Sequence, residues 1–571
     1  MLTLLSAALL LAAASVGVLV RLGLPDGRML RLAALPGLLL GFCELCGFCL
    51  IRDGAVPWSL PLLGASAGLG LVCALFFCAL WRLLKLWEGK LRAAKPRFAP
   101  LFTRLWLLWL LILVCWIPCF LGIFPGNFAY DTGGEYDQCA FGYSAAYPRL
   151  HSWLNVTVVN RVYGITGSFE AGVAVFTLLH MVLLALLFAW MLRRLYRLGL
   201  NGWVLLAGLL WCALFPTVQM LAVSPIRDLM FAGNLSALCF LLLLLGRDRD
   251  AFWRSPPQVL LLAAISALTV LSRNNSSPLL AMLLLAAFAL LLVLRAGRGN
   301  RRGALCFALV TLLLYGGLSA FLAHVCQPES AEGGSSAVAA LTQPILRCYT
   351  LDREQWSEEE LALFSEFFHT EGKLYAEADG DYSMAALKHL RNESGYGDFF
   401  RLWLGLFRRF PATYFDAWLE TTRPLWFPGD VIDAYVRSGG YEGFETCYYY
   451  YTRLNPGPGG YRELLPRVHD WYERLGTMLS FERLPVLRQI FSVGFHFWLL
   501  LGALFYLRWR RLSSPALLLL LAYVLLSALC PLILVRYFAA LYLAFPLQLA
   551  ALLQPGLLLA DSRRVEASAA V

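Results

Sequence analysis

Charged residues are scarce in this chain of 571 residues, where Asp, Glu, Lys and Arg together make up 15%. A soluble globular protein carries about 25%. Hydrophobic residues make up 59%, and many stand in apolar runs of about 20 residues, the length of a membrane-spanning helix. Because backbone polar groups in lipid must be paired within their own segment, such runs form helices. The sequence therefore predicts an all-α polytopic membrane protein.

A basic n-region is also missing at the start of the chain, so the apolar run at 2–20 is expected to be a retained helix rather than a cleaved signal peptide. The formal net charge is +10, which could indicate a nucleic-acid partner. The Lys and Arg residues, however, stand in short clusters between apolar runs, as topogenic signals do. We therefore expect no nucleic-acid partner.

Metal-site spacings are missing from the polar segments. Most of the 15 cysteines lie inside apolar runs, where a thiol is usually a small buried hydrophobe. The cysteines of the polar segments match no metal-site pattern. A disulfide bond between two of them is one alternative if they face an oxidising exterior. They are Cys139, Cys326, Cys348 and Cys447.

About thirteen apolar runs follow one another along the chain, and basic connections between them alternate with less basic ones. Under the positive-inside rule the basic connections are cytoplasmic. This predicts a multi-pass protein of a bacterial cytoplasmic membrane, with the N-terminus outside and the C-terminus inside. The runs lie near 2–20, 32–51, 58–81, 105–124, 169–192, 202–222, 229–246, 257–272, 278–294, 303–324, 487–507, 514–535 and 537–555.

Four parts of the chain follow from this pattern. Residues 1–102 are predicted to form N-terminal transmembrane helices and a basic cytoplasmic loop. Residues 103–325 form a transmembrane core with its first external loop at 125–168, and residues 326–486 form a mainly helical extracytoplasmic domain. Residues 487–571 form the C-terminal transmembrane helices and a short cytoplasmic tail. The unusual polar residues then collect on the external side, where we expect the functional site.

The first external loop holds three carboxylates within seven residues, those of Asp131, Glu135 and Asp137. A carboxylate at the membrane–water boundary can deprotonate a hydroxyl or hold a cation, although loop acids are often simply solvated. The following segment, 147–164, is too polar to span the membrane and suits an interfacial helix. Its His151 can act as an acid, as a base or as a hydrogen-bond donor to phosphate, but an interfacial histidine is more often structural.

Three arginines stand at predicted external ends of apolar runs, namely Arg227, Arg273 and Arg536. Arg227 with Asp228 fits either a neutralised pair at a tight hairpin or a phosphate-binding group. Arg273 either binds phosphate through parallel hydrogen bonds or snorkels to lipid headgroups. Arg536 and Tyr537 have almost no loop around them. A charge so near hydrocarbon is normally paired or functional, so a functional role is favoured there.

In their order along the chain these residues resemble the motifs of GT-C membrane glycosyltransferases, most closely an uncharacterised bacterial branch with a YD…Q first external loop. That branch carries PG…YD…Q, HPxxHT, KD, RNN, a QxxAR-like stretch and a late RY. Tyr147 stands for the first histidine of HPxxHT, Ser152 for its threonine, and Arg227 for the lysine of KD. The similarity covers about 103–555, at Pro125-Gly126, Tyr130-Asp131, Gln138, Tyr147 to Ser152, Arg227-Asp228, Arg273-Asn274-Asn275, Gln343, Arg347 and Arg536-Tyr537.

The resemblance implies a GT-C-like fold and an inverting glycosyltransferase that moves a sugar from a polyprenyl-phosphate donor to an envelope glycan, lipid or protein. It implies that Asp131 is the general base, with Glu135 and Asp137 as lesser candidates, and that arginines stabilise the leaving phosphate. No cofactor is required; the acids could bind a divalent metal, but no ligand spacing demands one. The implied substrate-binding residues are Tyr130, Gln138, His151, Arg227, Asp228, Arg273, Asn274, Gln343, Arg347, Arg536 and Tyr537.

Two other functions fit the same sequence, a transporter or flippase of a lipid-linked glycan and a non-catalytic protein that binds a polyprenyl lipid. Transporters usually carry broken helices and ionisable residues near mid-membrane. The acids and arginines here gather at the predicted external ends of the runs instead. Transport by purified protein in liposomes without sugar transfer would favour the flippase, and lipid binding without turnover would favour the binding protein.

The topology gives a first testable prediction. A reporter fused after Arg302 should be cytoplasmic, because the basic connection 295–302 is held inside. A reporter inserted within 330–480 should be external. Paired alkaline phosphatase and fluorescent protein fusions measure both positions, and the opposite pattern would place the clustered polar groups in the cytosol.

Overall fold

The computed structural model describes most of the chain as helix. Among its described residues there is no β-strand, only two isolated bridges between single residues, so the all-α prediction is confirmed. The described residues are 2–93, 96–128, 131–273, 300–327, 339–372, 374–375, 380, 383, 385–388, 395–430, 462–476, 489–530 and 532–558.

Six helices of the described part are long and apolar enough to cross a membrane, or up to eight spans if each bent helix pair counts as one. The chain is thus a multi-pass membrane protein. The six are α2 (Gly27–Asp53), α3 (Leu60–Ala93), α4 (Leu105–Gly122), α7 (Phe169–Arg197), α10 (Arg227–Arg247) and α14 (Arg301–Val325). Shorter apolar helices are α1 (Leu2–Leu22), α12 (Pro256–Leu271), α23 (Val493–Trp509) and α24 (Pro515–Ser527).

The sequence prediction of about thirteen spans is finer than these six to eight, and its run at 278–294 lies outside the described residues. The two bent pairs are α8 (Gly202–Leu214) with α9 (Pro216–Ala222), and η5 (Val535–Phe538) and α25 (Ala539–Leu543) with α26 (Phe545–Leu553). They bend by 55° and 43°. Pro216 explains the first break, because proline has no N–H to donate to the preceding turn.

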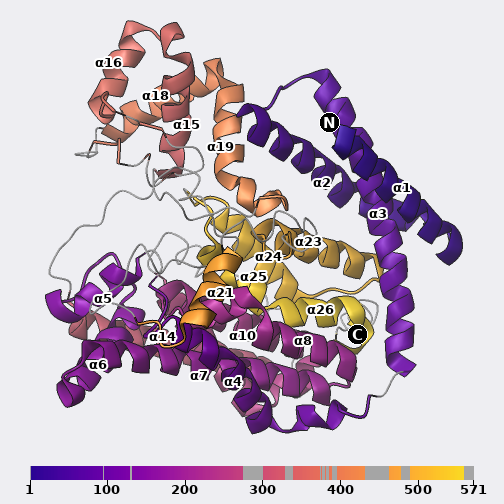
Figure 1. The fold of residues 1–571 in the computed structure, drawn as a ribbon, viewed down its shortest axis with the longest axis vertical. Coiled ribbons are helices and arrows are strands. Elements are labelled where there is room, and N and C mark those ends of the chain that lie inside the picture. The colour runs from indigo at the N-terminus through magenta and orange to yellow at the C-terminus, as the bar shows by residue number, and fades with distance from the viewer. Residues whose placement is uncertain are drawn as a thin grey trace.

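A bundle forms the lower part of the molecule in Figure 1, with α4, α7, α8 and α10 side by side and the C-terminal helices α23 to α26 packed onto them. Helix α10 is the most deeply buried of the six long apolar helices. The short helices α5 (Thr132–Phe141) and α6 (Arg149–Thr166) lie at the left end of this bundle, and α1 to α3 stand at the right. Further short helices are η1 (Ala99–Thr103), α11 (Arg249–Trp253), α21 (Pro466–Gly476) and α27 (Pro555–Leu558).

A separate helical unit stands above the bundle in Figure 1 and is formed by described residues of 339–426, whereas α21, also within 326–486, lies in the bundle against α4. Its core holds stacked aromatic rings, with Phe364 4.1 Å from Tyr349 and 4.8 Å from Phe368 between centroids. The unit is made of α15 (Ala339–Asp352), η3 (Arg353–Gln355), α16 (Glu358–Phe367) and α18 (Gly395–Arg409), and α19 (Pro411–Trp426) runs from it to the bundle.

The loop between α2 and α3 holds this upper unit in place. The Asp416 carboxylate on α19 accepts hydrogen bonds from the backbone N–H of Val56 at 3.3 Å and from the Trp58 indole at 3.0 Å. Arg347 on α15 donates to the carbonyl of Gly54 at 2.5 Å. Gly54 ends α2 with a φ of 68°, a left-handed conformation that favours glycine. The loop between the N-terminal helices α2 and α3 therefore anchors the upper unit.

Removing the Asp416 carboxylate should weaken the contact between the α2–α3 loop and the upper unit. In Asp416→Ala the buried Val56 N–H and the Trp58 indole lose their acceptor, and an unsatisfied buried donor costs about 1–3 kcal/mol. We expect a lower thermal midpoint of the detergent-solubilised protein and faster proteolysis of the upper unit. Asp398→Ala is the matched control, because its ion pair with Arg401 is exposed and contributes about 0–1 kcal/mol. Equal effects of the two variants would contradict the anchoring role of Asp416.

Candidate active site

The loop after α4 is fixed against the turn between α9 and α10. The Asn127 backbone N–H donates to the carbonyl of Val223 at 2.9 Å, and its side-chain amide donates to Ser224 Oγ at 2.9 Å. A Cβ at Gly126 would lie 2.6 Å from Thr177 Oγ1, so this close approach needs glycine. These contacts bring the start of α5 next to the start of α10, and so bring acids of the loop next to Arg227.

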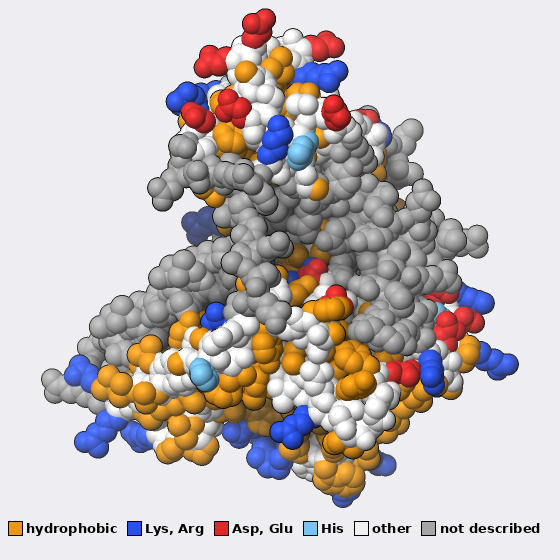
Figure 2. Space-filling view, turned by 90° about the vertical axis from the view of Figure 1, so that its left-hand side faces the viewer, with side chains coloured by type: hydrophobic (Ala, Val, Ile, Leu, Met, Phe, Trp, Pro, Cys, Tyr) orange, Lys and Arg blue, Asp and Glu red, His pale blue; other side chains and the backbone are white. Residues whose placement is uncertain are grey.

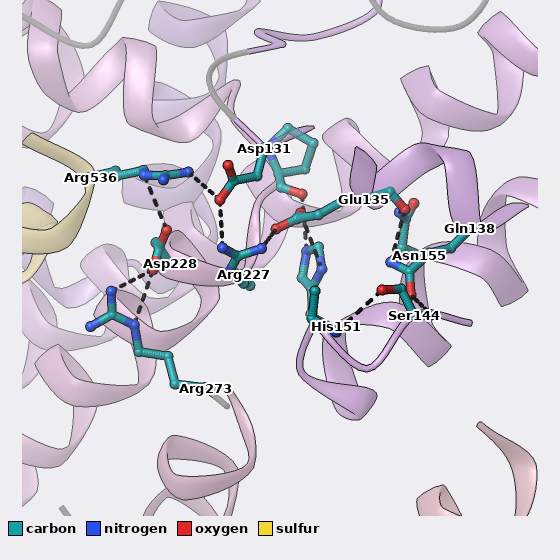
Figure 3. A network of polar contacts seen from close by, with 12 residues as sticks. Asp131, Glu135, Gln138, Ser144, His151, Asn155, Arg227, Asp228, Arg273 and Arg536 are labelled. Atoms are coloured by element: carbon teal, nitrogen blue, oxygen red, sulfur yellow. Dashed lines mark hydrogen bonds and ion pairs between the residues drawn. The ribbon is translucent and has the colours of Figure 1, made fainter. Parts of the chain in front are cut away.

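Asp131 lies between two arginines at the end of this loop (Figure 3). Its Oδ2 accepts from Arg227 Nη2 at 2.5 Å and is 3.0 Å from Arg536 Nη1. Arg227 also donates through Nη1 to Glu135 Oε1 at 3.0 Å, one turn further along α5. The guanidinium of Arg227 thus joins the two acids of the loop.

Asp228 lies between two arginines as well. Arg273, just beyond the end of α12, donates to Asp228 Oδ1 through Nε at 3.1 Å and Nη2 at 2.7 Å. Arg536 Nε is 3.5 Å from Asp228 Oδ2. The ion pairs therefore run in one alternating series, in which Arg536 is shared by Asp228 and Asp131. We call this series the charge cluster; its members in order are Arg273, Asp228, Arg536, Asp131, Arg227 and Glu135.

Aromatic side chains hold the arginines of the charge cluster. The Tyr537 ring lies near two guanidinium groups, with its centroid 4.9 Å from Arg536 Cζ and 5.2 Å from Arg273 Cζ. The Tyr523 hydroxyl accepts from Arg273 Nη1 at 3.2 Å and donates to the backbone carbonyl of Tyr537. Such cation–π contacts are strongest when desolvated. The guanidinium groups are therefore oriented before any ligand binds.

A polar shell from α6 supports Glu135 (Figure 3). The backbone carbonyl of Glu135 accepts from Asn155 Nδ2 at 3.0 Å and from Gln138 Nε2 at 3.2 Å. His151 Nδ1 is 3.5 Å from Glu135 Oε2, and His151 Nε2 is 3.1 Å from the carbonyl of Pro225. Because His151 and Asn155 are four residues apart, they lie on the same face of α6. That face is polar and buried, whereas the sequence indicated only an interfacial helix.

Burial and the arginines separate the two loop acids. Burial by itself raises the pKa of Asp131, but Arg536 and Arg227 outweigh it, so the pKa lies below its ordinary value. At Glu135 burial dominates and raises the pKa to about 8 in spite of Arg227. Burial lowers the pKa of His151 to about 3, so its imidazole is neutral at physiological pH. Two carboxylates in different environments can divide acid and base roles.

Asp131 is the member of the charge cluster most open to solvent. Its side chain is 35% exposed, against 15% for Arg227 and 2% for Glu135. Figure 2, turned toward the side where α5 and α6 lie, shows acidic side chains at the bottom of a hollow between the upper unit and the bundle. Ligands that enter from this side would meet Asp131 first.

A cluster of buried ions rarely serves stability. Taking each ion out of water costs several kcal/mol, and well-packed apolar residues are often as stable as a buried pair. Ionisable groups at the ends of membrane helices are therefore functional-site candidates, and perturbed pKa values strengthen that interpretation. The charge cluster is the best candidate for an active site in the described part of the chain.

Most of the residues singled out from the sequence meet at this site. The charge cluster and its shell contain Asp131, Glu135, Gln138, His151, Arg227, Asp228, Arg273, Arg536 and Tyr537. Asp137 is exposed on α5. Gln343 and Arg347 lie apart on α15, where Gln343 accepts from Ser383 Oγ at 2.6 Å. Tyr130 and Asn274 lie outside the described residues.

Sequence reasoning missed three contributors. Tyr523 stands in the apolar run 514–535, where its hydroxyl was the only signal. Asn155 follows His151 by four residues, a spacing that could have marked a shared polar face. Tyr147 was noted only as a departure from HPxxHT, yet its ring centroid lies 4.9 Å from Arg227 Cζ and fixes that arginine from a second side.

Within the described residues there is no group of three or more His, Cys, Asp or Glu side chains placed to hold a metal ion. The acids of the charge cluster contact arginines instead. Of the polar-segment cysteines, Cys139, Cys326 and Cys348 are free thiols, and Cys447 lies outside the described residues.

A family model described as a family of unknown function, DUF6020, matches residues 144–549, more than half of the chain. The chain belongs to the DUF6020 family. The DUF6020 region includes α6 to α25 and the first part of α26, and with them His151 and the three arginines of the charge cluster, while Asp131 and Glu135 precede it. No curated protein and no solved structure matches the chain.

Breaking the cluster at Asp228 should strongly destabilise the protein. Asp228→Ala leaves Arg273 and Arg536 buried with one carboxylate fewer, and loss of one partner from a buried pair costs about 3–5 kcal/mol. The thermal midpoint in detergent should fall clearly, and Asp228→Ala combined with Arg273→Met should recover part of the loss. Asp53→Ala is the control, because its pair with Arg52 is exposed. A double variant as unstable as the sum of its single variants would argue against the coupling.

Proposed function

We propose that the chain is an inverting glycosyltransferase of GT-C type, which transfers a sugar from a polyprenyl-phosphate donor to an envelope glycan, lipid or protein. The observation that carries the proposal is the contact of Asp131 with Arg536, 3.0 Å apart although they come from the first loop and the last membrane segment. Most of the described residues that resemble GT-C motifs thus lie together around one carboxylate that solvent can reach, Gln343 and Arg347 excepted.

Asp131 is the general base in this mechanism. Both arginines contact its Oδ2, so Oδ1 is the oxygen available to an acceptor hydroxyl. Arg227 and Arg536 keep the carboxylate ionised near neutral pH, because they hold its pKa below the ordinary value. A base must be in its ionised form when the acceptor arrives, and the cluster provides that form.

The arginines act on the leaving group. As the acceptor oxygen attacks the anomeric carbon, the bond from that carbon to the phosphate oxygen breaks, and the phosphate keeps the bonding electrons. The acceptor proton passes to Asp131. Attack opposite the leaving group inverts the anomeric carbon. Guanidinium groups bind phosphate through paired hydrogen bonds, and preorganised cations stabilise the charge that develops on it.

Donor binding also changes the base. A phosphate that contacts Arg536 or Arg227 competes with Asp131 Oδ2 for the same N–H groups. Asp131 loses part of its charge pairing when this happens, so its pKa rises. The carboxylate thus becomes a stronger base when a donor is present. Without a donor it is a weaker base and takes up a proton less readily.

The rest of the proposal concerns placement. The protein has about thirteen spans in a bacterial cytoplasmic membrane, its N-terminus is outside, and the charge cluster faces the extracytoplasmic side. The exposed part of the Asp131 side chain is then open to an acceptor from the envelope. A lipid-linked donor reaches the arginines from the outer leaflet.

Asp131→Asn should abolish sugar transfer, with a loss of at least about 100-fold, because the amide cannot accept the proton and general-base catalysis contributes roughly 10²–10⁴-fold. Transfer is measured with radiolabelled polyprenyl-phosphate hexoses and pentoses and membrane acceptors. Asp137→Asn, on the same helix but exposed, should keep transfer near the wild-type rate. Full transfer by Asp131→Asn, at equal membrane insertion, would remove Asp131 from the mechanism.

A flippase of a lipid-linked glycan is the second candidate, and the two bent helix pairs favour it, since broken spans are frequent in transporters. Both bent pairs adjoin the charge cluster, at the turn before Arg227 and at Arg536 in η5. Purified protein in liposomes separates the two functions. Movement of a fluorescent lipid-linked glycan without sugar transfer would replace the glycosyltransferase proposal with this one.

A further inference from the structure

Glu135 and His151 meet as two hydrogen-bond acceptors. His151 Nε2 lies 3.1 Å from the backbone carbonyl of Pro225, and a carbonyl only accepts, so Nε2 carries the hydrogen. His151 Nδ1 lies 3.5 Å from Glu135 Oε2. In a neutral imidazole whose Nε2 is protonated, Nδ1 carries a lone pair. A lone pair and an ionised carboxylate would repel one another unless a proton lies between them.

The surroundings decide which partner carries that proton. His151 is 2% exposed, and burial lowers its pKa, so a second proton on the imidazole is disfavoured. Glu135 is 1% exposed, and its Oε2 has no hydrogen bond within the described residues. Oε1 receives Arg227. A proton on Oε2 satisfies both atoms at once, because the O–H then points to the Nδ1 lone pair.

We propose that Glu135 is a neutral carboxylic acid that donates its proton to His151 Nδ1, so that the charge cluster has a net charge of +1 and binds a phosphate-bearing anion. The sum is three positive arginines against two negative aspartates, Asp131 and Asp228. The identity of this anion as the donor phosphate rests on the proposed function, whereas the position of the proton does not.

The groups that face Glu135 are accounted for on every neighbouring element. Among the described residues they are Asp131 before α5, Tyr136 on it, Tyr147 before α6, His151 on α6, Arg227 and Asp228 on α10, and Arg536 on η5, while His180 on α7 acts on His151. Arg227 and Arg536 favour the ionised form of Glu135, while burial and the two aspartates favour the neutral form. The opposing effects bring the pKa of Glu135 to about 8.

The direction of the pH effect follows from the charge. Below about pH 8 Glu135 keeps its proton and the charge cluster is positive. As the pH rises through that value, Glu135 ionises and the net charge falls to zero. Phosphate binding should therefore weaken on going to alkaline pH. A unit charge this close to the anion is worth a few kcal/mol at an effective dielectric constant of about 20, so we expect at least about tenfold weaker binding.

Infrared spectroscopy tests the proton directly. The wild-type protein at neutral pH should show the C=O band of a protonated carboxyl group, and this band should be missing in Glu135→Gln. Asp137→Asn is the control and should keep the band, since Asp137 is exposed on the same helix. Other buried carboxyl groups contribute equally to both spectra, so a difference spectrum of wild type minus Glu135→Gln without a protonated-carboxyl band would overturn the inference.

Binding of farnesyl phosphate in detergent tests the consequence. Gln keeps the neutral charge of the acid, its Oε1 can accept from Arg227, and its amide can donate to His151. Glu135→Gln should therefore lose the alkaline weakening of binding that the wild type shows. The ratio of the two affinities removes the titration of the probe itself. Equal pH dependence in both proteins would contradict the inference.

The two failures can be told apart. A protonated-carboxyl band together with pH-dependent probe binding, but no transfer of any sugar, would leave the Glu135–His151 proton in place and remove the glycosyltransferase. Sugar transfer without that band would do the reverse. If Glu135→Gln does not fold, the pH titration of the band in the wild type still decides, since it must vanish near pH 8.

Discussion

The site depends on one guanidinium group that serves two carboxylates. Arg536 lies 3.0 Å from Asp131 and 3.5 Å from Asp228, so it joins the first loop, the start of α10 and the last membrane segment. Without it the series of ion pairs would separate into two unconnected parts, Arg273 with Asp228 and Arg227 with Asp131 and Glu135. Because an unpaired charge is so costly there, the cluster fixes how these three segments meet.

The charge cluster and His151 together place seven ionisable side chains at one site, and five of them are buried. Burial lowers the pKa of His151 and keeps its imidazole neutral, whereas the arginines lower the pKa of Asp131 and keep it ionised. Burial raises the pKa of Glu135 to about 8. Environment rather than residue type sets these differences, as in other sites where two carboxylates have unlike roles. A lipid phosphate that enters would exchange its hydration for guanidinium groups that are already oriented by Tyr537 and Tyr523, and such preorganisation is the main source of electrostatic catalysis.

The sequence allowed the helical, multi-pass class to be predicted, because long apolar runs permit little else. It also indicated most members of the site, since charges such as Arg536 stand out beside apolar runs. It did not indicate which pairs form. Pairing depends on how α5, α10 and η5 are packed, which hydropathy does not encode. Likewise the resemblance to a QxxAR-like stretch pointed to Arg347, but it did not indicate that this side chain donates to the carbonyl of Gly54. Tyr523 was hidden because a single hydroxyl changes the apolarity of its run so little.

The order of synthesis gives Arg536 a further significance. Asp131 and Asp228 enter the membrane region early, while the arginine that they share arrives only with the last bent pair, η5 to α26. Until then each aspartate has one arginine partner, Arg227 for Asp131 and Arg273 for Asp228, and the two pairs are not joined to one another. Insertion of the final segment closes the series of charges and the helix bundle in one step. Completion of the site and completion of biogenesis would then coincide, because the cation that joins the first loop to the start of α10 is supplied only by the last segment.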